Sequence, residues 1–345
     1  IDQALAQGFL MSPDSSIQRT QAPTEKVYPS PQSFVTADLF TLQWHITQAC
    51  DLHCKHCYDR SERTPMAVDR AMAILDDLYD FCRRMNVRGQ VTFTGGNPLL
   101  YPHFDVVYQA ASQLGFGIAV LGNPTPMGRI EQLLAIARPL YFQVSLEGLA
   151  THNDYIRGKG HFEKTLAFLK GLRELNIFSM VMLTLTRDNL DQVLPLAELL
   201  EDRVDFFTFN RLSTVGEGAN LLMPDKKSFE TFLSAYTIAA ADNPIMGFKD
   251  NLFNLLRRDK GEPPFGGCTG YGCGAAFNFL ALLPDGEIHA CRKFPSPLGN
   301  IGQNSLYEIY HAHQAARYRA GSHACVKCDL NLVCRGCLAI THSLG

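Results

Sequence analysis

Short apolar runs alternate with longer amphipathic segments between Leu42 and Asn210, and this alternation restricts the fold more than any other feature of the sequence. The runs typical of strands are LQWHIT, VTFTG, FGIAVLG, LYFQVSL, FSMVMLTLT and DFFTFN. They are separated by helical patterns over 66–85, 104–114, 127–137, 161–174 and 189–201. Because strands that alternate with helices form parallel sheets, six such units predict an α/β fold, a partial (β/α)6 TIM barrel with its active site at the C-terminal strand ends.

Three cysteines follow the first expected strand in the run ITQACDLHCKHCYDR, where Cys50, Cys54 and Cys57 have the spacing C-x3-C-x2-C. A 4Fe–4S cube takes four ligands, so three thiolates leave one iron able to bind a small molecule. A C-x-x-C redox pair and a zinc site are the alternatives for this motif. The triad predicts a cluster whose fourth iron is the reactive position.

This spacing resembles the signature of the radical S-adenosylmethionine (SAM) enzymes, although His56 stands where that family usually has an aromatic residue. The resemblance extends from about residue 40 to the end of the sequence, because TFTGGNPLL, LGNPTP, VSLEGLATHNDYIRG and FNRLSTVGEGAN follow in the family's order. It implies that SAM chelates the free iron and is cleaved, on reduction, to a 5′-deoxyadenosyl radical that abstracts hydrogen from a substrate.

The resemblance also assigns residues to the SAM site. Gly95 and Gly96 in TGGNP would let the backbone approach the cofactor closely. Asn97 replaces a glutamate that is common in the family, so its contact with the cofactor's ammonium is expected to be weaker. Later strand ends supply Ser145, Glu147 and Asn210, and Arg157 in YIRG matches a position that often meets the cofactor carboxylate. The alternatives are a plain turn for TGGNP, a capped strand end, a surface ion pair and ordinary polar loop groups.

Seven cysteines lie between Phe265 and the end of the sequence, more than one metal site requires. Their spacing resembles the SPASM extension of radical SAM peptide-modifying enzymes, including LLPDGEIHAC, in which Pro-Asp-Gly favours a hairpin turn. The resemblance implies one auxiliary 4Fe–4S cluster on Cys268, Cys273, Cys291 and Cys337. It implies a second on Cys325, Cys328 and Cys334.

The fourth ligand of the second auxiliary cluster is open at this stage. A cysteine beyond Gly345 is the favoured candidate, and His342 or an iron open to substrate or water are the others. The last two cysteines are two residues apart where three is common, so the ligand pairing could be rearranged, and a zinc ribbon over 325–337 is an alternative. Cys82 lies in a helical pattern and is expected to be an ordinary buried cysteine.

The expected organisation is a lead-in over 1–38, a radical SAM barrel over 39–215, a helical bridge over 216–264 without evident chemical groups, and a SPASM domain over 265–345. The content of 46% hydrophobic and 19% charged residues is ordinary for a globular protein, and a net charge of -3 offers no case for nucleic-acid binding. No apolar run is long enough for a membrane helix, and the N-terminus lacks a signal-peptide pattern. The protein is therefore expected to be soluble and cytoplasmic.

Auxiliary clusters that accept an electron or ligate a substrate group suit oxidative chemistry on peptides. The resemblance implies an oxidoreductase that matures ribosomally made peptides (RiPPs), with the selenobiotic or thio(seleno)oxazole peptide maturases as one candidate group. The product would be a thioether, another crosslink or a cysteine-derived modification. Sulfatase-maturing relatives carry an acid directly after the third auxiliary cysteine, where this chain has Arg292, which cannot act as a base at neutral pH.

The implied partners are a precursor peptide, an external electron donor of the flavodoxin or ferredoxin type, and a separate peptide-recognition protein if the lead-in does not capture the leader. Two other functions fit the same motifs. One is a radical SAM enzyme that acts on a small molecule such as a tetrapyrrole, and the other is a noncatalytic iron–sulfur electron carrier.

Overall fold

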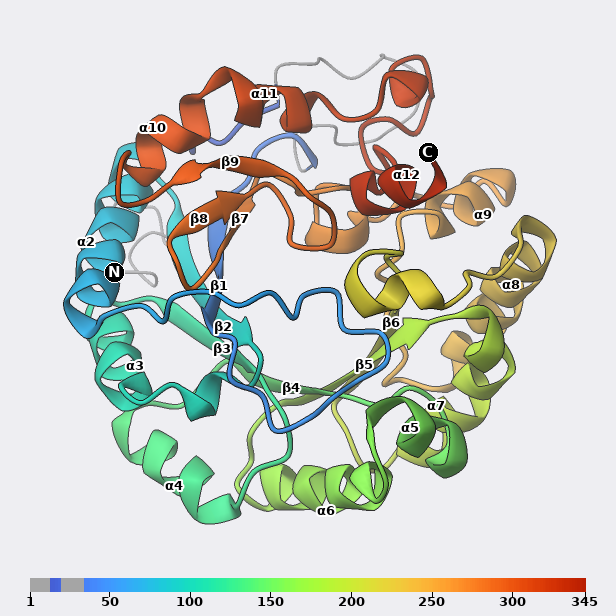
Figure 1. The fold of residues 1–345 in the computed structure, drawn as a ribbon. Coiled ribbons are helices and arrows are strands. Elements are labelled where there is room, and N and C mark those ends of the chain that lie inside the picture. Colours follow the sequence, from blue (N-terminus) through green and yellow to red (C-terminus); the bar gives the residue numbers. More distant parts are fainter. Residues whose placement is uncertain (1–12, 20–33) are drawn as a thin grey trace, which may run out of the picture.

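The computed structural model describes residues 13–19 and 34–345, and its first six strands are parallel and neighbour one another in chain order. They are β1 (Leu39–Thr47), β2 (Arg88–Gly95), β3 (Gly117–Leu121), β4 (Tyr141–Ser145), β5 (Ser179–Leu185) and β6 (Phe206–Arg211). The strands curve around a central space, and helices form an outer ring around them (Figure 1). The expected partial barrel is confirmed.

The outer helices are α2 (Val68–Met85), α3 (Phe104–Gln113), α4 (Met127–Ile136), α5 (Ala150–Arg157), α6 (His161–Glu174) and α7 (Val193–Leu200). Helix α2 buries an apolar stripe that includes Ile74, Leu78 and Phe81. The pattern over 189–201 is only partly an α-helix, because a 3-10 turn over Arg187–Gln192 precedes α7. Helix α5 is absent from the sequence prediction, which treated its residues as a cofactor motif.

A C-terminal hairpin extends the barrel sheet at its β1 edge. Strand β7 (Phe279–Leu282) pairs in parallel with β1, and β8 (Glu287–His289) and β9 (Pro297–Asn300) continue in antiparallel order. The turn predicted from Pro-Asp-Gly joins β7 to β8, with Gly286 in the left-handed region at φ 89°. Since Cys291 follows β8, this pairing brings the third auxiliary cysteine to the barrel.

The remaining α-helices continue the outer ring between β6 and α2 (Figure 1). They are α8 (Lys226–Asp242) and α9 (Phe253–Asp259) in the bridge, and α10 (Leu306–His311), α11 (His313–Ala320) and α12 (Leu338–Leu344) after the hairpin. Of the lead-in, residues 13–19 and 34–38 are described: Gln18 forms an antiparallel bridge with Thr36, and Ile17 is buried. Three lead-in prolines, Pro23, Pro29 and Pro31, lie outside the described residues.

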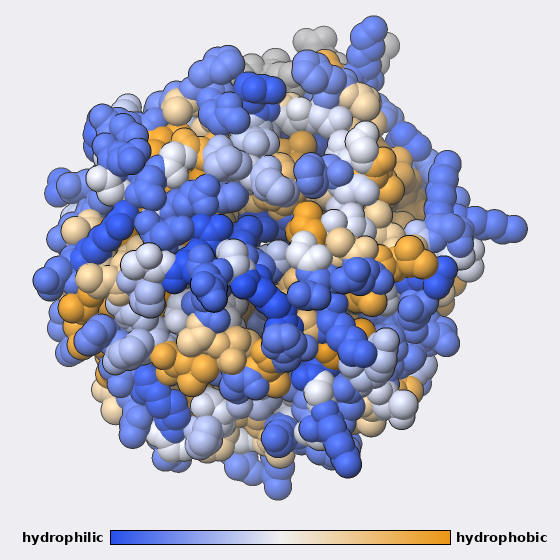
Figure 2. Space-filling view, in the orientation of Figure 1, coloured by the Kyte–Doolittle hydropathy of each residue, from blue (hydrophilic) through white to orange (hydrophobic). Residues whose placement is uncertain are grey.

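The face of the molecule that looks down on the barrel mouth is mainly hydrophilic, with apolar side chains in scattered patches (Figure 2). Within the described ranges, no helix combines the length and the apolar character needed to cross a bilayer.

Candidate functional site

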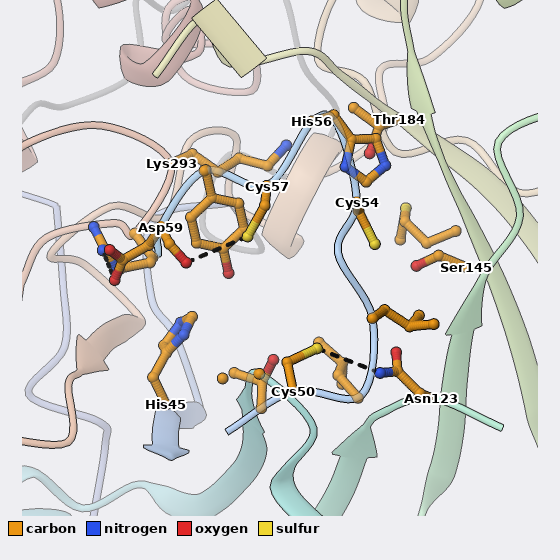
Figure 3. A pocket seen from close by; sticks show the side chains of 18 of the residues that line it. His45, Cys50, Cys54, His56, Cys57, Asp59, Asn123, Ser145, Thr184 and Lys293 are labelled. Atoms are coloured by element: carbon orange, nitrogen blue, oxygen red, sulfur yellow. Dashed lines mark hydrogen bonds and ion pairs between the residues drawn. The ribbon is translucent and has the colours of Figure 1, made fainter. Parts of the chain in front are cut away.

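The C-terminal ends of the barrel strands surround a cavity of about 490 Å³. Cys50, Cys54 and Cys57 all line it, from the single loop that follows β1 (Figure 3). Strand-end residues line the opposite walls, among them Gly95, Gly96, Ser145 and Asn210. The cavity has the volume of a typical small-molecule site, roughly 300–1,000 Å³.

Backbone hydrogen bonds fix the cysteine loop from three sides. The amide of Asn97, after β2, donates to the carbonyl of Ala49 at 2.7 Å, and the amide of Lys55 donates to the carbonyl of Ile156 in α5 at 3.0 Å. The amide of Glu217 donates to the carbonyl of Cys57 at 2.9 Å. The loop is therefore held in place by the fold itself.

Gly95 and Gly96 are required by this loop. A Cβ on Gly96 would lie 2.1 Å from the carbonyl oxygen of Ala49, and one on Gly95, whose φ is +130°, would lie 2.2 Å from that of Thr47. Side chains here would displace the backbone that leads into Cys50. In this structure the two glycines allow a close approach to the backbone of the cysteine loop, and their expected approach to the cofactor stays a prediction.

Asn97 does not line the cavity, in contrast to its expected contact with SAM. Its side chain is buried, caps the 3-10 turn Pro98–Leu100 by accepting from the amide of Leu99, and donates to Asp51 Oδ1 at 3.2 Å. Asn123, which the sequence analysis did not single out, lines the cavity and donates to the same oxygen at 2.6 Å. Its Nδ2 also lies 3.6 Å from Cys50 Sγ, so two asparagines position the start of the cysteine loop.

Glu147 is also absent from the cavity wall, because Arg157 and His56 surround its buried carboxylate. Arg157 donates to Glu147 Oε1 at 2.5 and 2.9 Å, and His56 Nε2 lies 2.8 Å from the same oxygen. The Glu147 side chain is 1% exposed and that of Arg157 is 9% exposed, so the alternative of a surface ion pair is wrong. Burial alone would raise the pKa of Glu147, but His56 and Arg157 hold it well below its usual range.

Arg157 contacts the cysteine loop as well as Glu147, so the buried ion pair lies next to the triad. It lines the cavity, and its Nη1 lies 3.8 Å from Cys54 Sγ. Burial raises the pKa of the Cys54 thiol, and the guanidinium opposes that rise by stabilising the thiolate. The histidine that replaces the family's aromatic residue at position 56 therefore has a definite role, since it completes the support of Arg157 through Glu147.

Polar side chains from the strands face the cavity at alternate positions, for example Gln43 and His45 on β1. His45 is 2% exposed, and its Nε2 has no hydrogen-bond partner in the described structure. Burial, followed by the charge of Arg292, lowers the pKa of His45 to about 3, so its imidazole is neutral near pH 7. The sequence contained this signal, because polar residues alternate with apolar ones in LQWHIT.

The C-terminal segment closes the cavity on the side of β1. Arg292 and Lys293 line it, and Arg292 forms an ion pair with Asp59 from the cysteine loop. Figure 3 shows Lys293 and Asp59 beside Cys57. Arg63 bonds to Asp285 at 2.6 Å and to Glu287 at 2.9 Å, which fastens the same loop to the hairpin. Two sets of ion pairs therefore join the residues that follow Cys57 to residues on both sides of Cys291.

The C-terminal thiols fall into two sets by their mutual electrostatic effects. Besides burial, neighbouring thiolates raise the pKa of Cys273 and Cys291 to about 12 and also raise that of Cys268. These three and Cys337 form the first auxiliary group. Burial, with Cys325 and Cys328, raises the pKa of Cys334 to about 11, and these three form the second auxiliary group.

The C-terminal thiols fit thiolate ligands of a metal cluster. Backbone N–H groups of Lys293 and Gly336 donate to the sulfurs of Cys291 and Cys334, and such donors favour the charged form. All eleven cysteines are free of disulfides in the described structure. No three His, Cys, Asp or Glu side chains in the described ranges meet around a single-ion site. A cube presents a separate iron to each thiolate, so its ligands stand further apart than those of one ion.

The helical bridge, expected to carry no chemical groups, ties the two auxiliary groups together. Asn251 Oδ1 accepts from the amide of Cys268 at 2.7 Å, and its Nδ2 donates to the carbonyl of Cys334 at 2.7 Å. Asp250 pairs with Arg211 at the end of β6 at 2.6 Å. Nothing in the sequence pattern around 250 distinguishes these residues from ordinary loop groups.

Two family models match the chain. Residues 44–200 match the Radical SAM superfamily, and residues 273–338 match the SPASM model, described as an iron–sulfur cluster-binding domain.

Curated relatives match most of the chain at low identity. The antilisterial bacteriocin subtilosin biosynthesis protein AlbA of Bacillus subtilis is 24% identical over 85% of this chain, which spans 66% of AlbA, slightly less than two thirds. The mycofactocin maturase MftC of Mycolicibacterium smegmatis is 29% identical over 88% of this chain and 79% of MftC. An AdoMet-dependent heme synthase of Nitratidesulfovibrio vulgaris is 23% identical over 88% of each chain.

Among solved structures, Streptococcus suis SuiB bound to the precursor peptide SuiA superposes with a TM-score of 0.70. It is 16% identical, and the match covers 97% of this chain and 82% of that chain. At this identity the similarity establishes a shared fold.

Proposed function

The chain belongs to the radical SAM family and carries a C-terminal SPASM domain, and from this we propose that it is a peptide maturase. In this proposal it cleaves SAM reductively and oxidatively modifies a ribosomally made peptide. Its cofactors are a 4Fe–4S cluster that binds SAM and auxiliary 4Fe–4S clusters. When bound, the reduced cluster and SAM supply a 5′-deoxyadenosyl radical that abstracts hydrogen from an unactivated carbon.

We assign the SAM-binding cluster to Cys50, Cys54 and Cys57. We assign the first auxiliary cluster to the first auxiliary group and the second to the second auxiliary group. Contacts with SAM are proposed for the cavity-lining residues Gly95, Gly96, Asn123, Ser145, Arg157 and Asn210. Asn97 and Glu147 act behind the cavity wall, Asn97 by holding Asp51 and Glu147 by holding Arg157.

The observation that carries the proposal is that one cavity is lined both by the cysteine triad and by the segment directly after Cys291. A substrate side chain in this cavity lies between the SAM site and the first auxiliary group. In that position a carbon radical formed by hydrogen abstraction is close to a group that can accept its electron. This arrangement suits oxidative modification, because a new bond formed at the expense of two hydrogens removes two electrons from the substrate. The 5′-deoxyadenosyl radical takes the first together with the abstracted hydrogen, and the auxiliary cluster would take the second as the other hydrogen leaves as a proton.

The size of the cavity favours a peptide over a tetrapyrrole. A volume of about 490 Å³ suits one ligand of the size of SAM, so only part of a second molecule fits beside it. One amino acid side chain meets this limit, whereas a complete macrocycle does not. Two of the three curated relatives described above are named for peptide or bacteriocin maturation, and the third is named a heme synthase, so a tetrapyrrole is the alternative substrate.

The product is proposed to be a thioether, another crosslink or a cysteine-derived modification. Formylglycine formation is disfavoured, because Arg292 is engaged by Asp59 and cannot accept a proton. The proposed electron donor is an external flavodoxin or ferredoxin. The precursor's leader is captured either by this chain or by a separate recognition protein.

The test is anaerobic reconstitution followed by measurement of iron, sulfide and dithionite-dependent 5′-deoxyadenosine. Three clusters correspond to about twelve irons per chain. Cys54→Ala should abolish 5′-deoxyadenosine formation, and the exchange of buried Cys82 for Ala is the matched control, since that thiol lies in α2. Retained cleavage in Cys54→Ala would refute the triad assignment. Cleavage stimulated by a porphyrin but by no peptide encoded beside the gene would support the tetrapyrrole alternative.

A further inference from the structure

Three arginines lie between the two auxiliary groups, and their hydrogen bonds end on backbone carbonyl oxygens. Arg19 donates to the carbonyls of Tyr271 and Cys273, each at 2.9 Å. Arg319 donates to those of Ala276 at 3.1 Å and Tyr310 at 2.7 Å. Arg335 donates to those of Arg319 at 3.0 Å and Ala320 at 2.9 Å. These three residues are called the arginine trio below.

The arginine trio concentrates positive charge in a largely enclosed place. Arg335 is 4% exposed, Arg19 and Arg319 are half-buried, and Arg19 Nε is a buried N–H without an acceptor in the described structure. Removing such charges from water costs several kcal/mol each unless opposite charges compensate them.

No ion pair joins a carboxylate of the described residues to the trio. Arg335 directly follows Cys334 of the second auxiliary group and lies two residues before Cys337 of the first. Arg19 bonds to the carbonyl of Cys273, which also belongs to the first group. Cysteine sulfurs that ligate a cluster as thiolates are therefore a source of opposite charge beside the trio.

Arg19 also makes the lead-in part of the auxiliary site. Its guanidinium carbon lies 3.8 Å from the centre of the Phe277 ring, and its amide donates to the carbonyl of Val35 at 2.9 Å. Its contact with Cys273 spans 254 positions of sequence. Ile17, two residues earlier, is completely buried and fixes this segment. Capture of a peptide by the lead-in would not require Arg19 to bond to the backbone of Cys273. This contact therefore indicates a role of the lead-in at the auxiliary site.

We propose that the arginine trio is the counter-charge of the auxiliary clusters and keeps their reduction potentials high enough to accept an electron from a substrate radical. The proposal rests on the cluster assignment made under Proposed function. Reduction adds one electron, and therefore one negative charge, next to the trio. Fixed positive charge stabilises the reduced form more than the oxidised form and so raises the potential. Net charge around a cluster is one of the factors that set its potential.

The test is a redox titration of the full-length, reconstituted protein, with dithionite as reductant and ferricyanide as oxidant, followed by electron paramagnetic resonance. A Cys54→Ala background removes the signal of the SAM-binding cluster. Arg19→Met and Arg335→Met should each shift an auxiliary midpoint potential to more negative values. Arg335→Met should affect both auxiliary signals, because Arg335 lies between Cys334 of the second group and Cys337 of the first. Arg19→Met should mainly affect the signal of the first group, because Arg19 contacts Cys273 of that group.

Two kinds of control distinguish the effect of lost positive charge from that of structural damage. They are lysine variants of the trio and a methionine variant of a distant arginine. Arg19→Lys and Arg335→Lys keep the positive charge but lose donors, so their potentials should stay near that of the parent protein. Arg138→Met is the matched control, since Arg138 also donates only to backbone carbonyls, those of Leu175 and Asn176, at an exposed site between α4 and α6. It should leave both potentials unchanged.

Each result decides the question. Normal iron content with unchanged potentials in both methionine variants overturns the inference and leaves the proposed function intact. Equal shifts in the lysine and methionine variants also overturn it, because charge would then be irrelevant. If a methionine variant loses iron, iron retained by the matching lysine variant supports the counter-charge, and iron lost from both opposes it. A parent protein without auxiliary clusters refutes the cluster assignment and the inference together.

Discussion

Asp59 and Arg292 form an ion pair across the cavity, and each lies close in sequence to a cysteine of a different group. Asp59 is two residues after Cys57, and Arg292 directly follows Cys291. The Asp59 carboxylate also accepts from Ser61 at 2.6 and 2.9 Å and from Gln48 at 2.8 Å. These contacts hold its pKa well below the usual range although burial opposes them, so the pair is charged at neutral pH.

Removal of either partner of this pair should destabilise the protein. The side chains are 10% and 11% exposed, and an uncompensated charge in such a place costs about 3 kcal/mol. Asp59→Asn and Arg292→Gln should each lower the free energy of unfolding by about that amount, whereas the double variant should lose less than the sum. Denaturant unfolding of all four proteins gives the coupling energy. Strict additivity would show that the two residues do not support each other.

Gly96→Ala should impair SAM cleavage through the cysteine loop. The added Cβ would lie 2.1 Å from the carbonyl oxygen of Ala49, so the backbone before Cys50 has to move. We expect at least a tenfold slower formation of 5′-deoxyadenosine. In Gly128→Ala the new Cβ meets no atom within 4 Å in α4, and this control should gain about 0.5–1 kcal/mol of stability with unchanged cleavage. Equal activity of the two variants would contradict the crowding argument.

The barrel was predictable from the sequence because its strands and helices have strong, separate periodicities. The hairpin after Leu282 was predictable from turn chemistry, but its parallel pairing with β1 was not, since no local pattern encodes which strand edge is free. The cysteine triad was predicted from its spacing, and the two auxiliary groups were implied by the resemblance to the SPASM extension. The functions of His56, Asn251 and Arg19 did not, because their partners Glu147, Cys334 and Cys273 are distant in sequence and each contact depends on the folded backbone.

Asn97→Glu should weaken SAM binding, although relatives commonly have glutamate at this position. Asn97 is 2% exposed and donates to Asp51 Oδ1, so a glutamate would place two carboxylates together where a hydrogen bond now exists. We expect about a tenfold higher Kd for SAM, equivalent to about 1.4 kcal/mol, in anaerobic equilibrium dialysis. Adding Asp51→Asn should restore most of the affinity. Tighter SAM binding by the single variant would instead show that residue 97 contacts the cofactor directly, as the family resemblance implies.

The acid sensitivity of folding should depend on His161, which is buried at the start of α6. Its Nδ1 lies 3.1 Å from Asn153 Nδ2, and burial lowers its pKa to about 4, against about 6.5 in an unfolded chain. Between these values the unfolded chain binds a proton that the folded chain does not, so stability falls as the pH decreases from 6.5 to 4 and changes no further below that.

His161→Gln removes this proton, and the variant should therefore lose about 2 kcal/mol less stability than the parent between pH 7.5 and pH 5. Urea unfolding at the two pH values measures the difference, and every other titrating group cancels because it is common to both proteins. His313→Gln, at an exposed position in α11, is the matched control and should follow the parent. If His161→Gln shows the same pH dependence of stability as the parent, the pKa of His161 is not lowered. The imidazole is then protonated at pH 5 in the folded protein, in its buried place between Asn153 and Thr165.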